Sequence, residues 1–142
     1  HWAVEPQVPD FRDTWPVHCA AGTEGAAFHE ELDPILDDID AIFRKGRHHA
    51  AYSGFEGSTD DGEELAAWLE ARAITAVDVV GIATDHCVRA TALDAIDAGL
   101  DTTVRLDLTA GVNDDTTRSA INQLRTAGIH LVGQPFGFHD WK

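Results

Sequence analysis

An apolar run at residues 77–82 stops at small and polar residues, and a cysteine follows at Cys87. The run has the length and composition of a buried strand, and the segment that begins at Cys87 has the spacing of an amphipathic helix. The sequence therefore predicts a strand-to-helix junction with a thiol at the amino end of the helix. Backbone N–H groups and the helix dipole favour anions at such a point, so the position favours thiolate over thiol.

Strand and helix patterns alternate through the second half of the chain. We expect strands over 77–82, 103–108 and 129–132, and helices over 63–72, 87–98 and 115–127. Asp60 or Asp61 can cap the first of these helices, and Gly99 and Gly128 suit the ends of the other two. This alternation predicts βαβ units, and hence an α/β fold with a parallel sheet covered on both faces.

The first half of the chain is less regular. Its first thirty residues have many prolines and glycines, no period, and the character of a loop. Residues 32–39 have helical spacing, but Pro34 lies among them, so a helix there is short or begins at the proline. Residues 41–44 are predicted to form a short strand that leads into Lys45. Residues 133–142 are interpreted as a docked or frayed tail, with packing on a neighbouring molecule as the alternative.

Composition narrows the function classes. The 142 residues suffice for one domain with a core, and no apolar run is long enough to cross a bilayer. The net charge of −15 argues against binding nucleic acid or an anionic membrane; it fits either a salty cytoplasm or a high-GC genome. Two cysteines are too few for a disulfide framework, and the chain shows no signal pattern, so we expect a reducing, cytoplasmic setting.

Cys87 and Lys45 each follow a predicted strand, and ligands of open α/β sheets bind beyond the carboxyl ends of the strands. Lys45 is the only lysine besides Lys142, and its ammonium group could stabilise a Cys87 thiolate. The alternatives are a solvated surface charge for the lysine and a small buried hydrophobic residue for the cysteine. His1 and His18 could bind a first-row metal, although their spacing matches no metal motif.

The stretch from Gly81 to Ala95 (GIATDHCVRATALDA) resembles the signature of nicotinamidases, also called pyrazinamidases, in the isochorismatase-like hydrolase superfamily. Four more segments resemble the metal loop, the lysine strand, a substrate-side loop and the stretch after the next strand of that family: Thr14–Cys19, Phe43–Gly46, Ala51–Gly57 and Asp107–Val112. The resemblance covers nearly the whole chain. It implies a three-layer, Rossmann-like parallel-sheet fold without its N-terminal strands. Cys87 is typical of the cysteine hydrolase branch, and the preceding Asp-His favours nicotinamidase over carbamoylsarcosine-type enzymes.

The resemblance also implies roles for individual residues. Cys87 would attack the carboxamide carbon of nicotinamide, Lys45 would support the thiolate, and the backbone N–H groups of Ala83 and Cys87 would form an oxyanion hole. The peptide between Ile82 and Ala83 is expected to be cis. Ammonia would leave, water would hydrolyse the thioester, and the nicotinic acid would enter NAD salvage. His1 and His18 would hold zinc, iron or manganese, and Trp15 and Tyr52 would line the pocket for the small-molecule amide. His86, from its position beside Cys87, could donate to that substrate or cap the helix.

The sequence also departs from that family. Its members begin with a strand that ends in the catalytic aspartate, and a later strand supplies an Asp-x-His pair of metal ligands. This sequence starts at the next metal histidine, His1, and holds neither feature. We therefore expect residues 1–142 to form one isochorismatase-like domain that is incomplete at its N-terminus. An upstream segment or a companion polypeptide would complete it, and the fragment alone would have little or no amidase activity.

Three further possibilities stay open at this point. The substrate could be another small amide or carbamoyl compound within the same superfamily. The chain could instead be an inactive, truncated domain that serves binding or assembly. Assembly into a homo-oligomer is also compatible with the sequence.

Overall fold

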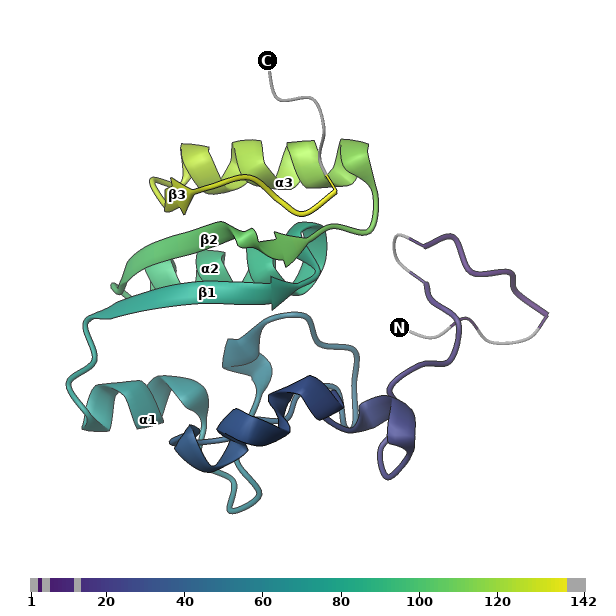
Figure 1. The fold of residues 1–142 in the computed structure, drawn as a ribbon, viewed down its shortest axis with the longest axis horizontal. Helices are drawn as coiled ribbons and strands as arrows, with labels where there is room; N and C mark the ends of the chain where they lie inside the picture. Colours follow the sequence, from purple (N-terminus) through teal and green to yellow (C-terminus); the bar gives the residue numbers. More distant parts are fainter. Residues whose placement is uncertain (1–2, 4–5, 12–13, 138–142) are drawn as a thin grey trace. The chain divides into compact units, whose positions relative to one another are not determined.

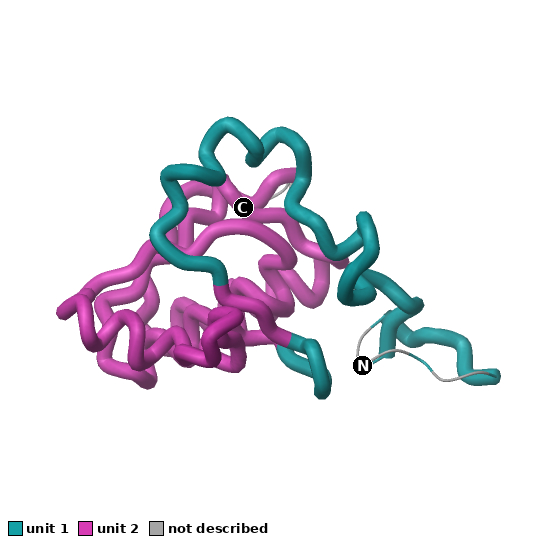
Figure 2. The backbone as a smooth tube through the Cα atoms, turned by 90° about the horizontal axis from the view of Figure 1, so that it is seen from below, with its two compact units in different colours: residues 1–42, 46–51 teal, residues 43–45, 52–142 magenta. Residues whose placement is uncertain are grey.

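The computed structural model describes residues 3, 6–11 and 14–137. The chain forms two compact units, one of residues 1–42 with 46–51 and one of residues 43–45 with 52–142 (Figure 2). The first unit contains two 3-10 helices, Glu24–Ala26 and Glu30–Asp38, and the second of them has Pro34 inside it. None of the helices in the described ranges has the length and apolar character that a bilayer span needs.

The second unit is built on a parallel sheet (Figure 1). Strands β1 (Ala76–Ile82), β2 (Asp101–Ala110) and β3 (His130–Val132) lie in the order β1-β2-β3. Helix α2 (Arg89–Asp97) connects the first two strands and α3 (Asp114–Thr126) connects the last two. The predicted βαβ alternation and the parallel sheet are therefore confirmed.

The hydrophobic core of this unit lies on one face of the sheet. Alternate β2 side chains, Val104 and Leu106, are buried against α2 and α3, because successive residues of a strand point to opposite faces. The rest of this cluster comes mainly from the two helices: Val88, Ala92, Ile121, Leu124 and Ile129. Elsewhere on the strands, Val80, Ile82 and Leu108 are exposed. Within the described part of this unit, the predicted helical cover is thus found on one face.

The pairing of β1 with β2 has an irregularity close to Cys87. Val79 pairs with Val104, but Gly81 pairs with Thr109, so one β1 residue faces a four-residue stretch of β2, 105–108. The Thr109 hydroxyl donates to the Leu106 carbonyl (3.0 Å) across this bulge. Gly81 has a φ of 104°, in the left-handed region that favours glycine. The carboxyl end of β1 is therefore shaped by both strands.

Two predicted helix starts are wrong. Helix α1 (Leu65–Ala71) begins after Glu64 rather than at Asp60 or Asp61, because residues 59–62 form a turn in which the Gly62 N–H donates to the Thr59 carbonyl. Helix α2 was expected from residue 87, but a π-helical turn, Thr84–Val88, comes first. The periodic pattern indicated a helix in each place and could not fix where its first turn begins.

The predicted strand at residues 41–44 is also wrong. Only Arg44 has strand pairing, a single antiparallel bridge to Ser58 in which both backbone groups take part (2.8 and 3.3 Å). A short apolar run becomes a strand only where a neighbouring strand bonds along its length, and this run has one bonded residue.

The predicted tail, residues 133–142, is docked in the part that the structure describes, 133–137. Phe136 donates its N–H to the Thr109 carbonyl (2.9 Å).

Candidate active site

Cys87 lies on a turn with unusual backbone geometry. The Ile82–Ala83 peptide is cis, as expected, and the π-helical turn Thr84–Val88 follows it and continues into α2. The Ala83 carbonyl accepts from the N–H groups of both His86 (3.0 Å) and Val88 (3.1 Å). Single π-helical turns are frequent at functional sites. The partly buried Cys87 side chain thus lies at the carboxyl edge of β1.

Lys45 and Cys87, 42 positions apart in sequence, meet at this edge. The distance between Lys45 Nζ and Cys87 Sγ is 3.0 Å. The same ammonium group also donates to the backbone carbonyl of Tyr52. An ammonium group at this distance stabilises the negative charge of a thiolate, the nucleophilic form of cysteine. The two residues that the sequence singled out on independent grounds therefore form one pair.

The loop that carries Tyr52 is fastened to α2. The Glu56 carboxylate accepts from the backbone N–H groups of Tyr52 and Ser53, both at 2.9 Å. Ser53 caps the 3-10 turn Gly54–Glu56, and the Gly54 N–H donates to the Thr91 hydroxyl of α2 (2.8 Å). A Cβ on Gly54 would come within 3.3 Å of the Thr91 methyl carbon, so the close approach favours glycine. These contacts hold the Tyr52 carbonyl where Lys45 reaches it.

Tyr52 and His86 form an aromatic pair beside the lysine and the cysteine. Their ring centroids are 5.4 Å apart and the ring planes are inclined by 32°. His86 Nε2 is 3.8 Å from the Asp85 carboxylate, whose side chain is fully buried. Tyr52, His86, Lys45 and Cys87 belong to the same unit, so the structure brings together these four of the predicted site residues.

Trp15 and His18 belong to the other unit. Their rings meet edge to face with centroids 6.4 Å apart, and His18 Nδ1 is 2.6 Å from the Pro16 carbonyl oxygen. His1 lies outside the described residues. Metal-ligating histidines commonly donate one ring N–H to a backbone carbonyl and coordinate with the other nitrogen, so the geometry of His18 suits a ligand.

A single histidine does not make a metal centre. Protein zinc sites have three or four ligands, and no cluster of three or more His, Cys, Asp or Glu that could hold a metal occurs among the described residues. The described residues by themselves therefore do not fit a complete metal site.

Sequence reasoning missed three residues that support the site. Thr84 and Asp85 are buried at 0% and 3% exposure, and Glu56 holds the Tyr52 loop. Thr84 donates its hydroxyl to Thr109 (2.9 Å), which ties the cysteine turn to the β2 bulge. The position of Thr84 and Asp85 between an apolar strand and Cys87 could have indicated that their side chains are buried and hydrogen-bonded. Glu56 three residues after Ser53 is a capping-box pattern that could also have been found.

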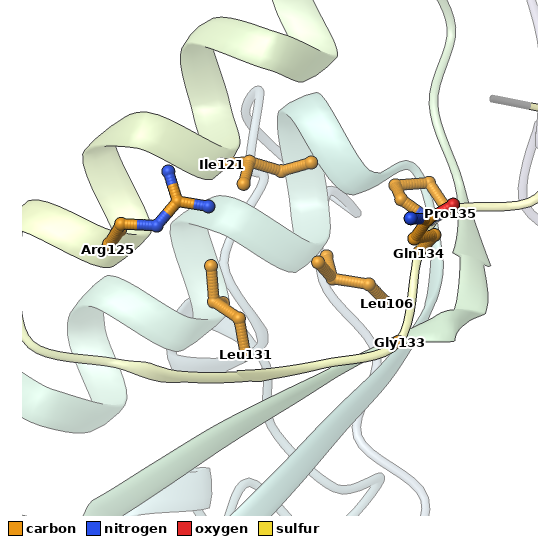
Figure 3. A pocket seen from close by; sticks show the side chains of 7 residues that line it. All are labelled: Leu106, Ile121, Arg125, Leu131, Gly133, Gln134 and Pro135. Atoms are coloured by element: carbon orange, nitrogen blue, oxygen red, sulfur yellow. The ribbon is translucent and has the colours of Figure 1, made fainter. Parts of the chain in front are cut away.

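Two pockets in the second unit lie away from this site. One, of about 170 Å³, lies between α3 and the segment after β3 and is lined by Leu106, Ile121, Arg125, Leu131, Gly133, Gln134 and Pro135 (Figure 3). The other, of about 390 Å³, lies between α1 and the end of α2. Cys87 and Lys45 line neither pocket, so the geometry of the pair, and not a cavity, identifies the candidate site.

The chain is similar to known proteins over most of its length. It is 54% identical over 124 residues to the nicotinamidase/pyrazinamidase of Mycobacterium tuberculosis, a match that covers 87% of this chain and 66% of that protein. The pyrazinamidase of Pyrococcus horikoshii, solved in complex with zinc, aligns with a TM-score of 0.68 and 35% identity over 83% of this chain and 62% of its own. PnC1 from L. infantum, solved in complex with nicotinate, aligns with a TM-score of 0.73 and 36% identity over 83% of this chain and 60% of its own.

The chain thus spans about two thirds or less of the length of these relatives. The family model described as the isochorismatase domain matches residues 3–134, which include Lys45, Cys87 and the whole parallel sheet. The chain therefore belongs to the isochorismatase-domain family of hydrolases.

Proposed function

We propose that this chain is the cysteine-bearing part of a nicotinamide amidohydrolase, which converts nicotinamide and water into nicotinic acid and ammonia. The observation that carries the proposal is the 3.0 Å contact between Lys45 Nζ and Cys87 Sγ at the carboxyl edge of a parallel sheet. A thiolate beside an ammonium group is the nucleophile that attack on a carboxamide requires. The similarity to proteins named nicotinamidases supports this substrate.

In the proposed reaction, Cys87 Sγ forms a bond to the carboxamide carbon and the carbonyl electrons move onto oxygen. The backbone N–H groups of Ala83 and Cys87 are proposed to stabilise that oxyanion. The carbon–nitrogen bond then breaks, and ammonia leaves with the proton that the thiol gave up. Water adds to the thioester, the carbon–sulfur bond breaks, and the thiol is restored as nicotinic acid leaves.

The aromatic pair of Tyr52 and His86 suits a flat heteroaromatic substrate. Trp15 is proposed as a further residue that binds the substrate. PnC1 from L. infantum was solved with nicotinate, the product of the proposed reaction, and this supports a pyridine carboxamide as the substrate.

The test is ammonia release by the intact protein from four amides: nicotinamide, pyrazinamide, carbamoylsarcosine and biuret. We expect turnover of the first two and little of the others. Turnover of carbamoylsarcosine or biuret alone would move the substrate to another small amide. An absence of turnover of all four, with Cys87 still titratable, would contradict the hydrolase proposal. Cys87→Ala is the control for contaminating amidase.

We also infer that the intact site binds a divalent metal ion, zinc, iron or manganese, with His18 and His1 among its ligands. The zinc complex of the Pyrococcus horikoshii pyrazinamidase and the contact of His18 Nδ1 with the Pro16 carbonyl support this. Elemental analysis of wild-type protein and of His18→Ala tests it: the variant should contain less metal. Equal metal content in the two proteins would contradict the assignment of His18.

The cellular setting follows from the chemistry proposed. Nicotinic acid is a precursor for NAD salvage, which we place in the cytoplasm, where the two cysteines that the structure shows free would stay reduced. A homo-oligomer or a companion segment remains part of this proposal. Size-exclusion chromatography with light scattering on the intact protein would report either.

A further inference from the structure

Asp85 is a buried charge that the proposed reaction does not use. It lies two residues before Cys87 on the same turn, and its side chain has no exposed area. Moving a carboxylate out of water is costly unless hydrogen bonds and charges replace the water. The partners of Asp85 therefore show what its burial achieves.

Those partners come from the junction between β2 and α3. The Val112 N–H donates to one carboxylate oxygen (3.0 Å). The Asn113 N–H (3.4 Å) and the Thr116 hydroxyl (2.5 Å) donate to the other. Asn113 also caps α3, accepting from the Asp115 N–H at 2.8 Å. One carboxylate thus joins the cysteine turn to the first turn of a helix about thirty residues further along the chain.

These hydrogen-bond donors stabilise the charged carboxylate form of Asp85. Burial by itself would raise the pKa of Asp85, but hydrogen bonds from Thr116 and Val112 and the nearby His86 outweigh it, and the pKa is lowered. A protonated or amide side chain would place a donor against at least one of the three donors. The junction is therefore built around an anion, and a neutral polar residue of the same size does not substitute for it.

We propose that Asp85 is a positioning residue: its carboxylate fixes the Thr84–Val88 turn on the β2–α3 junction and so holds Cys87 within reach of Lys45. Asp85 acts through the backbone of its own turn. Its effect on catalysis rests on the proposed amidohydrolase function, whereas its effect on the cysteine–lysine geometry does not.

The test uses Asp85→Asn in the intact protein with a Cys19→Ser background, so that Cys87 is the only thiol among residues 1–142, and alkylation is followed on the peptide that contains Cys87. Two quantities are measured at neutral pH: the rate of Cys87 alkylation by iodoacetamide, and kcat and KM for nicotinamide. We expect alkylation to slow by about tenfold, since the sulfur loses its alignment with the ammonium group. We expect kcat to fall by about tenfold or more while KM changes by less than about threefold.

Two matched controls separate positioning from stability. Ile121→Val destabilises the same core and leaves the hydrogen bonds of the turn in place, and Thr117→Val removes a buried α3 hydroxyl that has no hydrogen-bond partner among the described residues. Both should alkylate at the wild-type rate. If Asp85→Asn lowers the melting temperature as Ile121→Val does and alkylates at the wild-type rate, Asp85 is merely structural and the proposal is overturned.

If Asp85→Asn does not fold, Thr116→Val decides, because it removes one donor and leaves the carboxylate in place. Alkylation about two- to fivefold slower supports the proposal, and the wild-type rate overturns it. A wild-type protein that alkylates rapidly but releases no ammonia would contradict the proposed function alone. The alkylation series would still decide the role of Asp85.

Discussion

The turn at residues 83–88 and the segment at residues 14–18 both carry predicted site residues, but they are held in different ways. The turn is tied to positions distant in sequence, through Thr84 to Thr109 and through Cys87 to Lys45. The hydrogen bonds described for the segment at 14–18 join residues that are closer in sequence: the Thr14 N–H donates to the Asp10 carboxylate, His18 contacts the Pro16 carbonyl, and the Ala3 N–H donates to the Trp15 carbonyl twelve positions away.

This difference concerns preorganisation. Long-range hydrogen bonds between buried groups form only when the unit is folded. Opening the turn therefore costs a free energy close to that of unfolding the whole unit. Local contacts between exposed groups open at low cost. The cysteine turn is therefore expected to hold its geometry without a ligand, whereas the His18 segment is expected to gain rigidity from one.

The largest effect is expected at the sulfur itself. Cys87→Ala removes the nucleophile, and turnover of nicotinamide by the intact protein should fall by on the order of 10³-fold or more. The unfolding midpoint should change little, since the side chain is small and partly buried. Cys19→Ser, at the exposed cysteine, is the control and should stay active. Activity retained in Cys87→Ala would move the chemistry to another residue.

Asp85 comes next, with an effect on stability. Because its pKa is lowered in the folded protein, its charge stabilises the fold above its ordinary value of 3.8, and this contribution is lost as the pH falls through the folded pKa. Asp85→Asn should unfold more easily at neutral pH by about 2 kcal/mol, the cost of losing charge-assisted hydrogen bonds.

The difference between the two proteins should narrow as the pH falls through the ordinary Asp pKa of 3.8 and on through the lower pKa of Asp85 in the folded protein, since the other carboxylates are common to both. His86, on the same turn, and Arg89, whose guanidinium donates to the Asp85 carbonyl, are the basic groups nearby and are unchanged in the variant. Urea unfolding across this range measures the effect. A pH-independent difference would show that the carboxylate is not charged in the folded state.

Lys45 should have the next largest effect, on reactivity. Lys45→Met keeps the length of the side chain and removes the charge, so alkylation of Cys87 at neutral pH should slow by about tenfold. Lys45→Arg should restore little of the rate, because a planar guanidinium cannot reach both Cys87 Sγ and the Tyr52 carbonyl as an ammonium does. Full recovery in Lys45→Arg would show that only net charge matters at this edge.

The features that could be predicted from the sequence are those set by local patterns, and most of the features that could not be predicted depend on contacts between distant segments. The thiol at a strand end and the parallel sheet were predictable, because apolar runs, helix periods and topology rules act over short stretches. The pairing of Lys45 with Cys87 was also expected and is observed, but the strand at 41–44 that was to place Lys45 at the sheet edge is absent. The β2 bulge and the Asp85 junction were not predictable, since they arise from contacts between segments 25 or more positions apart. The strand expected at 41–44 failed for a related reason: pairing depends on a partner that no local pattern specifies. The π-helical turn was not predicted either, because its sequence has the same helical spacing as the α-helix that follows it.

A smaller effect is expected from removing the hydrogen bond between Thr84 and Thr109, which also holds the cysteine turn. Thr84→Val keeps the shape and removes the hydroxyl that donates to Thr109, which itself still donates to the Leu106 carbonyl. The protein should lose about 1 kcal/mol of unfolding free energy, a typical value for one buried neutral hydrogen bond. Chemical denaturation measures it, with Thr102→Val as a control in the same strand system, since that hydroxyl bonds only locally to the Leu100 carbonyl. An unchanged unfolding free energy in Thr84→Val would show that the Thr84–Thr109 bond does not stabilise the turn.

The smallest effect is expected from His18→Ala in metal-free protein, and the same variant tests the other half of the comparison. His18 is exposed and bonded to a carbonyl two residues away, so its removal should leave both the melting temperature and the alkylation rate of Cys87 unchanged. Added zinc should raise the melting temperature of the wild type, because a ligand that binds only the folded state stabilises it, and should raise that of the variant less. A large loss of stability in metal-free His18→Ala would show that the 14–18 segment is as firmly held as the cysteine turn.

Equal stabilisation of the wild type and of His18→Ala by zinc would show that His18 does not bind the metal. The stability of the metal-free protein reports how firmly the 14–18 segment is anchored, and the stabilisation by zinc reports whether His18 binds the metal. Neither measurement depends on turnover at Cys87.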